Sequence, residues 1–295
     1  MDNNRTSINN CFDEFIIDQK IKNNSPKTIE YYQMAFRQFQ RYYDCNNDIT
    51  SINMKLLKGY TLYLREKDIT DTSLQSYVRA FRAFLTWCYN EDILPVNYSE
   101  KYKLPKSQRK TIDILTEEEI KRLLGCFNLY NIIQLRDYCI CSLMLDSGLR
   151  KDEVITLKKE HLHLNEGYAI VDGKGNKQRT VPIGLNTRKY LAKYLRKQIY
   201  ESDYVFVTTR GTAITHTTMT QLFKKLKKRA DIERLHAHLL RHTFATKYLE
   251  NGGDMFSLQQ ILGHTTLEMV RRYVHINNGL KVKRFSEFSP LDNLA

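Results

Sequence analysis

Apolar residues recur at helical spacing along the first third of the chain. One run follows the Ser25-Pro26 pair at intervals of three and four: Ile29, Tyr32, Phe36, Phe39 and Tyr43. Such intervals place side chains on one face of a helix, and serine followed by proline is a favourable helix start. The pattern predicts a helix that begins at Pro26 and packs its aromatic face into a core.

A second strong helix is predicted from Thr72, which forms a capping box with Gln75. Its apolar face comprises Leu74, Tyr77, Val78, Phe81, Phe84, Leu85 and Cys88. Arg79 and Arg82 lie off this face, so they are free to contact either a partner or water. The first hundred residues therefore predict a helical domain with an aromatic core.

Residues 101–112 differ in composition from the sequence on either side. This stretch is poor in apolar residues and holds five cations: Lys101, Lys103, Lys106, Arg109 and Lys110. Such a composition is typical of a linker. We interpret it as a basic tether between domains at 1–100 and 113–295, although a plain solvated hinge fits equally well. Thr116 and Glu119 then form a capping box that opens the second domain.

The second domain is predicted to combine helices with a small sheet. Apolar and polar residues alternate in YAIVDG and QRTVPIG, on either side of a turn at 173–176. This alternation predicts an antiparallel hairpin with Lys174 at its tip. Residues 217–229 predict a helix whose end is rich in cations, among them Lys224, Lys225 and Lys228. The cations suit phosphate contacts, and a solvated helix face is the alternative. The expected fold class is mainly α with a small antiparallel β-sheet.

The charge balance indicates a polyanionic partner. The 295 residues include 46 Lys or Arg against 33 Asp or Glu, a net charge of +13 with a pI near 9.3. Residues 1–110 and the remainder are both net basic, which favours a protein that surrounds a duplex; a solvated surface that happens to be basic is the alternative. Six cysteines without a CxxC pair indicate small buried residues in reducing surroundings. The sequence shows no signal peptide and no apolar run of membrane length, so we expect a soluble, cytoplasmic protein.

Reactive side chains concentrate between residues 238 and 273. His238 and Arg241 stand three apart in HLLRHTFAT, so both leave the same helix face. His264 follows a Leu-Gly turn, and Tyr273 comes nine residues later. A guanidinium, two imidazoles and a phenol are the groups that a phosphodiester needs around it if the phenol is to attack. The arrangement predicts DNA strand cleavage through a tyrosine.

These motifs make the chain similar to the tyrosine recombinases of the phage-integrase family, of the short two-domain Xer-like type. The motifs are SGLRKDEV (147–154), GKGNKQRTVPIG (173–184), HLLRHTFAT (238–246), LGH (262–264) and RRYVHI (271–276). The resemblance covers nearly the whole chain and implies a SAM-like core-binding domain followed by an α+β catalytic domain. It assigns catalysis to Arg150, Lys174, His238, Arg241, His264 and Tyr273, with Glu153 supporting Arg150. It also implies site-specific recombination through a 3′-phosphotyrosine, by a homotetramer on two DNA duplexes with a dimer at each site.

Elementary chemistry supports these roles. A phenol with a pKa near 10 is ionised in roughly one molecule in a thousand at neutral pH, so attack needs positive charge or a base. Arg150 and Arg241 can fork onto the phosphate oxygens, and His264 can hydrogen-bond one of them. His238 can take or share the phenolic proton, and Lys174 can protonate the departing 5′ oxygen. No metal-type carboxylate cluster and no P-loop stands out, so we expect no metal, ATP or other cofactor.

Alternatives remain for some of these assignments. Lys177 or Lys151 could replace Lys174 as the acid, and Tyr248 is a second candidate nucleophile. His242 adjoins Arg241 but is expected to point off the active face, where it packs or caps. The remaining histidines near the cluster, His236 and His275, are interpreted as bystanders.

The segment after Tyr273 carries apolar residues among charges: Leu280, Val282, Phe285, Phe288 and Leu291. It predicts either docking on a neighbouring protomer or folding back onto its own domain. The tail and the lysine-rich composition favour a mobile-element integrase or resolvase, with an accessory directionality factor as an optional partner. A type IB topoisomerase-like relaxing enzyme and a non-catalytic DNA-binding protein of the same fold are the alternative functions.

Overall fold

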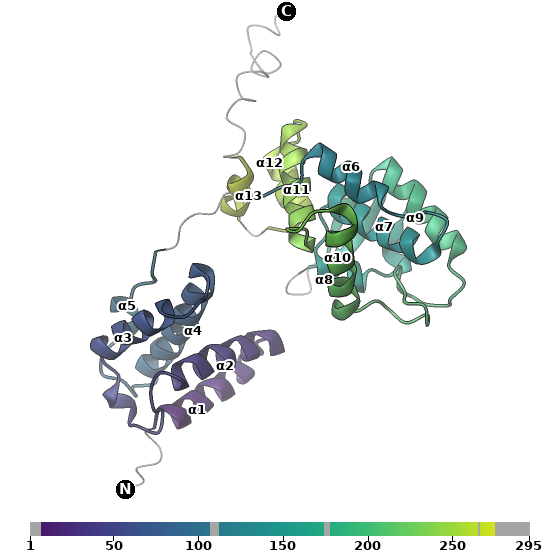
Figure 1. Cartoon of the computed structure of the whole chain (residues 1–295). Coiled ribbons are helices and arrows are strands. Elements are labelled where there is room, and N and C mark those ends of the chain that lie inside the picture. The colour runs from purple at the N-terminus through teal and green to yellow at the C-terminus, as the bar shows by residue number, and fades with distance from the viewer. Residues whose placement is uncertain (1–6, 107–111, 174–177, 265, 275–295) are drawn as a thin grey trace, which may run out of the picture. The chain divides into compact units, whose positions relative to one another are not determined.

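The computed structural model describes residues 7–106, 112–173, 178–264 and 266–274. The chain forms two compact units, Met1–Lys110 and Thr111–Ala295, each with its own group of helices (Figure 1). None of the helices in the described ranges combines the length and the apolar character that crossing a membrane requires.

Helices build the first unit. They are α1 (Ile8–Ile21), α2 (Pro26–Gln40), the 3-10 turn η1 (Ile49–Ser51), α3 (Met54–Arg65), α4 (Asp71–Asn90) and α5 (Tyr98–Lys101). The predicted start of α2 is confirmed, because the Ser25 hydroxyl accepts a hydrogen bond from the Thr28 amide and Pro26 is the first helical residue. Aromatic rings fill the core between the helices, with Phe39 stacked on Phe81 at a centroid distance of 4.1 Å.

The expected start of α4 at Thr72 is wrong. The helix begins two residues earlier, because the Thr70 hydroxyl accepts a hydrogen bond from the Ser73 amide at 3.2 Å. The Gln75 side chain instead donates to the carbonyl of Pro105 at 2.6 Å. The first core also extends beyond residue 100, since Tyr102 in the expected linker is only 3% exposed. Arg109 and Lys110 lie outside the described residues.

The second unit surrounds a small sheet with helices. Its elements are α6 (Glu117–Gly125), α7 (Ile132–Asp146), α8 (Lys151–Thr156), η2 (Lys159–His161), β1 (Leu162–His163), β2 (Tyr168–Asp172), β3 (Gln178–Pro182), α9 (Leu185–Lys197), α10 (His216–Ala230), α11 (Ala237–Glu250), α12 (Met255–Leu262) and α13 (Leu267–Val274). The strands pair antiparallel in the order β1-β2-β3, which confirms the predicted fold class.

The predicted hairpin is confirmed at its strands. Tyr168 pairs with Pro182 at one end of the β2–β3 ladder, and Asp172 pairs with Gln178 at the other. Lys174, the expected tip, lies outside the described residues. The predicted capping box also forms, because the Thr116 hydroxyl and the Glu119 carboxylate each accept a hydrogen bond from the other residue's amide.

A tight turn after α7 leads the chain into α8. Gly148 has a φ of +63°, a left-handed conformation that side chains with a Cβ disfavour. A Cβ at this position would meet the ring of Phe244 at 2.4 Å. The Ser147 hydroxyl donates to the Pro182 carbonyl at 2.6 Å and fixes the turn to the end of β3. The turn thereby sets where α8 begins.

Gly148→Ala is expected to destabilise the protein by at least about 2 kcal/mol, because a left-handed backbone and an overpacked core each add a penalty. Chemical denaturation measures the loss. Gly125→Ala is the control, since a Cβ there meets nothing within 4 Å and alanine favours the helical backbone. Equal stability of the two variants would contradict the packing described for Gly148.

Candidate active site

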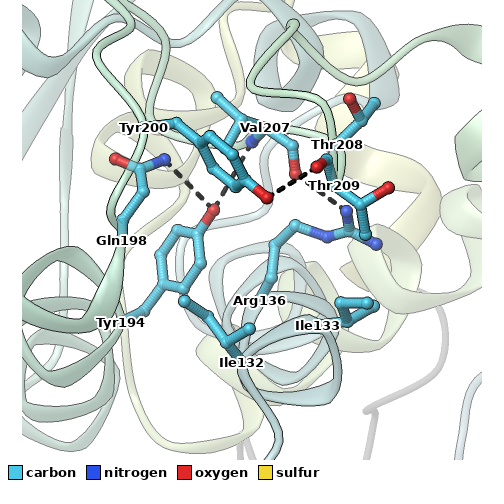
Figure 2. Close-up of a pocket in the computed structure, with 9 residues that line it drawn as sticks. All are labelled: Ile132, Ile133, Arg136, Tyr194, Gln198, Tyr200, Val207, Thr208 and Thr209. Atoms are coloured by element: carbon cyan, nitrogen blue, oxygen red, sulfur yellow. Dashed lines mark hydrogen bonds between the residues drawn. The ribbon is translucent and has the colours of Figure 1, made fainter.

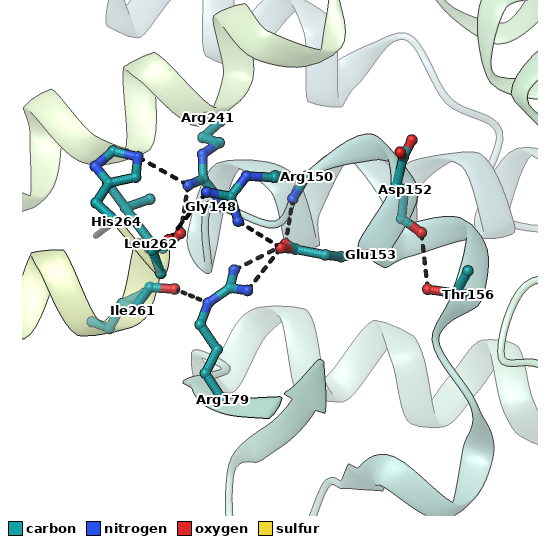
Figure 3. A network of polar contacts seen from close by, with 11 residues as sticks. Gly148, Arg150, Asp152, Glu153, Thr156, Arg179, Arg241, Ile261, Leu262 and His264 are labelled. Atoms are coloured by element: carbon teal, nitrogen blue, oxygen red, sulfur yellow. Dashed lines mark hydrogen bonds and ion pairs between the residues drawn. The ribbon is translucent and has the colours of Figure 1, made fainter. Parts of the chain in front are cut away.

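Three segments of the second unit bring predicted catalytic residues together (Figure 3). Arg150 lies at the start of α8, and Arg241 lies in the middle of α11. α12 ends at Leu262, and Gly263, which has a φ of +61°, then turns the chain back. This turn is held by a hydrogen bond from the His264 amide to the Gln259 carbonyl at 3.1 Å. It brings the His264 ring to the guanidinium of Arg241.

Arg241 is a buried cation that carbonyl groups hold in place. Its side chain is 4% exposed, and it donates to the carbonyls of Gly148 at 2.5 Å and Leu262 at 2.6 Å. A third contact, at 3.2 Å, joins Nη2 to Nε2 of His264. No carboxylate of the described residues forms an ion pair with it. Burial, and then the charge of Arg150, lower the pKa of Arg241 to about 9, so it stays cationic at neutral pH and favours an incoming anion.

Two arginines share the carboxylate of Glu153. Arg150 donates to it at 2.8 Å through Nη1, and its own amide donates at 2.7 Å. Arg179 of β3 forms a two-pronged contact with the same carboxylate at 2.7 and 2.9 Å, and its Nε donates to the Ile261 carbonyl at 2.7 Å. Figure 3 shows the two guanidiniums meeting at Glu153. The network joins α8, β3 and α12.

Glu153 remains ionised although it is only 3% exposed. Burial alone would raise the pKa of this carboxyl, but the hydrogen bonds and charge of Arg179, followed by those of Arg150, lower it below its ordinary value. The single carboxylate of Glu153 therefore pairs with the guanidiniums of Arg150 and Arg179, while Arg241 adds a third positive charge nearby. The excess of positive charge is what a phosphate group would neutralise.

Both histidines of the predicted set favour the neutral state. Burial, and then the charges of Arg241 and Arg150, lower the pKa of His264 to about 4. The pKa of His238 is also lowered, first by the protein that partly displaces water from its ring and then by Arg241. Neutral imidazoles can donate one hydrogen bond without adding charge to the cluster.

Tyr273 points into the second unit and contacts His242. Its ring is 4% exposed in the core of that unit, and its hydroxyl lies 2.9 Å from Nδ1 of His242. The expectation that His242 points off the active face is therefore wrong. Helical periodicity gives the reason, since His242 follows His238 by four residues and shares its face.

The predicted DNA-contact residues are mostly exposed. Arg79, Lys101, Lys103 and Lys106 lie at the surface of the first unit, and Lys224, Lys225 and Lys228 lie at the surface of α10. Arg82 is partly buried, and its Nε donates to the Ser99 carbonyl at 3.0 Å, which ties α4 to α5. Arg82 therefore stabilises the first unit through this contact. The sequence, in which Arg82 lies outside the apolar face of α4, did not indicate it.

Sequence reasoning missed Arg179. The signal was present, because Arg179 shares one face of β3 with the buried Val181, and side chains alternate along a strand. An arginine at an inward position needs a carboxylate partner. Which carboxylate it finds depends on how α8 packs against β3, and a local pattern does not contain that information.

A separate cavity lies between α7, α9 and the segment 200–209 (Figure 2). Its polar groups bond to one another. Arg136 donates to the Val207 carbonyl at 2.8 Å, and the Tyr200 hydroxyl donates to the Thr209 carbonyl at 2.6 Å. Arg136 also forms an ion pair with Asp137 at 2.7 Å. These satisfied contacts give the cavity a structural role.

Family models match both units. The model of the phage integrase family matches residues 113–279, and that of the phage integrase SAM-like domain matches residues 7–104. The tyrosine recombinase XerD of Halalkalibacterium halodurans is 30% identical over 297 residues, covering 96% of this chain and 99% of its own. XerD of Listeria monocytogenes is 28% identical, covering 90% and 93%.

Solved structures share the fold. The XerA recombinase is 28% identical, with a TM-score of 0.52 over 95% of this chain and 98% of its own. The Tn1549 transposon integrase in complex with circular intermediate DNA is 17% identical, with a TM-score of 0.77 over 91% and 95%. A lambda integrase dimer bound to a core site is 18% identical, with a TM-score of 0.75 over 90% and 95%.

A SAM-like helical unit followed by an α+β unit with clustered arginines defines a recombinase of the integrase type. The chain belongs to the phage integrase family and is a tyrosine recombinase, an enzyme of site-specific DNA recombination. Neither a topoisomerase-like relaxing enzyme nor a non-catalytic DNA-binding protein is favoured by these relatives.

Glu153→Gln is expected to destabilise the protein by about 3 to 5 kcal/mol, because it leaves partly buried arginines without their counter-charge. Denaturant unfolding measures this change. Glu160→Gln is the matched control, since its side chain is 65% exposed and exposed ion pairs contribute little. A Glu153→Gln protein as stable as the control would show that the shared carboxylate does not hold the network together.

His264 is expected to make the DNA-free protein sensitive to acid. Its folded pKa of about 4 lies below the ordinary 6.5, so within this window the unfolded chain binds the proton and the folded chain does not. The free energy of unfolding therefore falls as the pH is lowered from 6.5 towards 4. His264→Asn removes the contribution of this imidazole. Urea titrations at several pH values across the window should then show that the free energy of unfolding falls less steeply as the pH is lowered. An unchanged decline would contradict the burial of the imidazole.

Proposed function

We propose that this recombinase cleaves and rejoins DNA through a 3′-phosphotyrosine on Tyr273. The observation that carries the proposal is the buried Arg241 cation, which has neutral partners and lies beside Arg150 and its shared carboxylate. Such a cluster of cations would stabilise the extra charge of a five-coordinate phosphorus, and donors of this type contribute about 10²–10³-fold each in rate. Because Arg150 and Arg241 would neutralise the charge of the phosphate, the proposed reaction does not require a metal.

Each step of cleavage has a residue to perform it. The Tyr273 oxygen forms a bond to phosphorus while the bond from phosphorus to the 5′ oxygen breaks. Arg150 and Arg241 hold the non-bridging oxygens, and His264 hydrogen-bonds the phosphate. As the new bond forms, a histidine takes the phenolic proton, a role for which the sequence motif pointed to His238. In the reverse direction the 5′ hydroxyl attacks the phosphotyrosine, which retains the energy of the original bond, so rejoining needs no ATP.

Lys174 is proposed as the acid that protonates the departing 5′ oxygen. Its place in the turn between β2 and β3 rests on the family motif GKGNKQRTVPIG, and it lies outside the described residues. The alternative acids are Lys151, whose Nζ lies 3.4 Å from the Thr220 hydroxyl on α10, and Lys177, which also lies outside the described residues. The strands that carry Lys174 are anchored near the cluster through Arg179.

The proposed partner is double-stranded DNA at core recombination sites. The domain at 1–100 would bind core DNA, the basic linker at 101–112 would follow the backbone, and the catalytic domain at 113–295 would reach the scissile phosphate. The exposed Lys224, Lys225 and Lys228 of α10 suit backbone contacts, which position a protein without specifying sequence. The lambda and Tn1549 integrases, whose solved structures contain DNA, support a DNA partner.

We further propose a cytoplasmic homotetramer on two duplexes, with a dimer at each site, that serves a mobile element. The apolar residues after position 275 would dock on a neighbouring protomer, and an accessory factor would set the direction of exchange. Integration and excision, or resolution, are the reactions that such an assembly performs. The family and the lysine-rich composition support these points.

Incubation with labelled DNA from the flanks of the encoding gene tests the proposed chemistry. Wild type is expected to form a covalent adduct that survives denaturing electrophoresis, whereas Tyr273→Phe forms none because it lacks the attacking oxygen. Tyr248→Phe is the control and keeps the adduct. Arg150→Ala should abolish cleavage and largely spare duplex affinity, because many other cations contact the backbone. A persistent adduct in Tyr273→Phe would assign the nucleophile elsewhere.

A further inference from the structure

His242 stands where it can receive a proton from the nucleophile. Its Nδ1 lies 2.9 Å from the Tyr273 hydroxyl, within the range of a good hydrogen bond. The two ring centroids are 5.7 Å apart at an interplanar angle of 47°. The contact joins α11 to α13, two helices that pack against each other. The two residues therefore meet through their reactive atoms.

The other polar groups of the cluster are weak proton acceptors. Arg150 and Arg241 carry only donors and cannot take a proton. Nε2 of His264 is engaged with the guanidinium of Arg241 at 3.2 Å, and burial lowers the pKa of that ring to about 4. Burial and Arg241 lower the pKa of His238 as well. A weakly basic ring removes a phenolic proton inefficiently.

We infer that His242 is a further catalytic residue, the general base that takes the phenolic proton of Tyr273 during strand cleavage. The inference rests on the proposed phosphotyrosine chemistry. As the bond between the Tyr273 oxygen and phosphorus forms, the phenolic proton passes to Nδ1 of His242, and the departing 5′ oxygen takes its proton from Lys174. Rejoining reverses both transfers, so His242 returns the proton to Tyr273.

The surroundings of His242 suit this role. Its side chain is half-buried, so the proton it accepts can exchange with water between turnovers. Its ring centroid lies 6.5 Å from that of His238 on the same helix face. His238 is exposed beside Arg241 and remains available to the phosphate. The two histidines of HLLRHTFAT thereby divide the tasks, one directed to the phosphate and the other to the nucleophile.

His242→Asn tests the inference, because its amide can occupy the place of Nδ1 and hydrogen-bond the phenol but does not accept a proton. On a nicked duplex that traps the wild-type adduct, single-turnover cleavage should slow by about 10²-fold or more, with duplex affinity and thermal midpoint unchanged. His161→Asn is the matched control, an identical exchange outside the cluster, and should cleave like wild type. Cleavage by His242→Asn at or above the wild-type rate would overturn the inference.

A more acidic nucleophile separates proton transfer from positioning. With 3,5-difluorotyrosine at position 273, the phenol needs less help from a base, so the rate deficit of His242→Asn should shrink at least about tenfold. A deficit of unchanged size would overturn the base assignment and leave His242 a positioning residue. If wild type forms no adduct on any duplex, the phosphotyrosine proposal fails instead, which distinguishes the two failures.

Discussion

The active site depends on how few negative charges face its cations. Glu153 is one carboxylate between Arg150 and Arg179, and Arg241 is fixed by carbonyl dipoles and an imidazole. A second carboxylate would neutralise more of the cluster, but it would occupy the place that we propose for the phosphate. The cluster instead holds three guanidiniums with a single carboxylate between two of them. The folded protein therefore presents a preorganised anion-binding site before DNA binds.

The elements that build this pocket have clear local causes. The turn at Gly148 directs the chain so that Arg150 directly precedes α8, and the left-handed Gly263 returns the chain after α12 so that His264 reaches Arg241. Neither glycine takes part in the chemistry. Each permits a backbone direction that other residues disfavour, and the reactive side chains inherit their positions from these turns.

Much of the fold and of the site followed from the sequence because the signals are local. The stripe in α2, the capping box at Thr116 and the β2–β3 hairpin were predictable from spacing alone. The cap of α4 was misplaced because Thr70 and Thr72 are both plausible caps two residues apart. The partner of Arg179 and the contact of His242 with Tyr273 depend on how distant segments pack, which spacing does not encode. The periodicity of α11 already placed His242 beside His238, and that signal was overlooked.

Arg179 also gives the site a mechanical property. It belongs to a hairpin strand, yet its guanidinium is bonded both to the carboxylate of α8 and to the backbone at the end of α12. A pull on that strand must therefore displace Glu153, and through it Arg150, or else break a two-pronged ion pair. The shared carboxylate thus couples the position of β3 to the position of the Arg150 guanidinium.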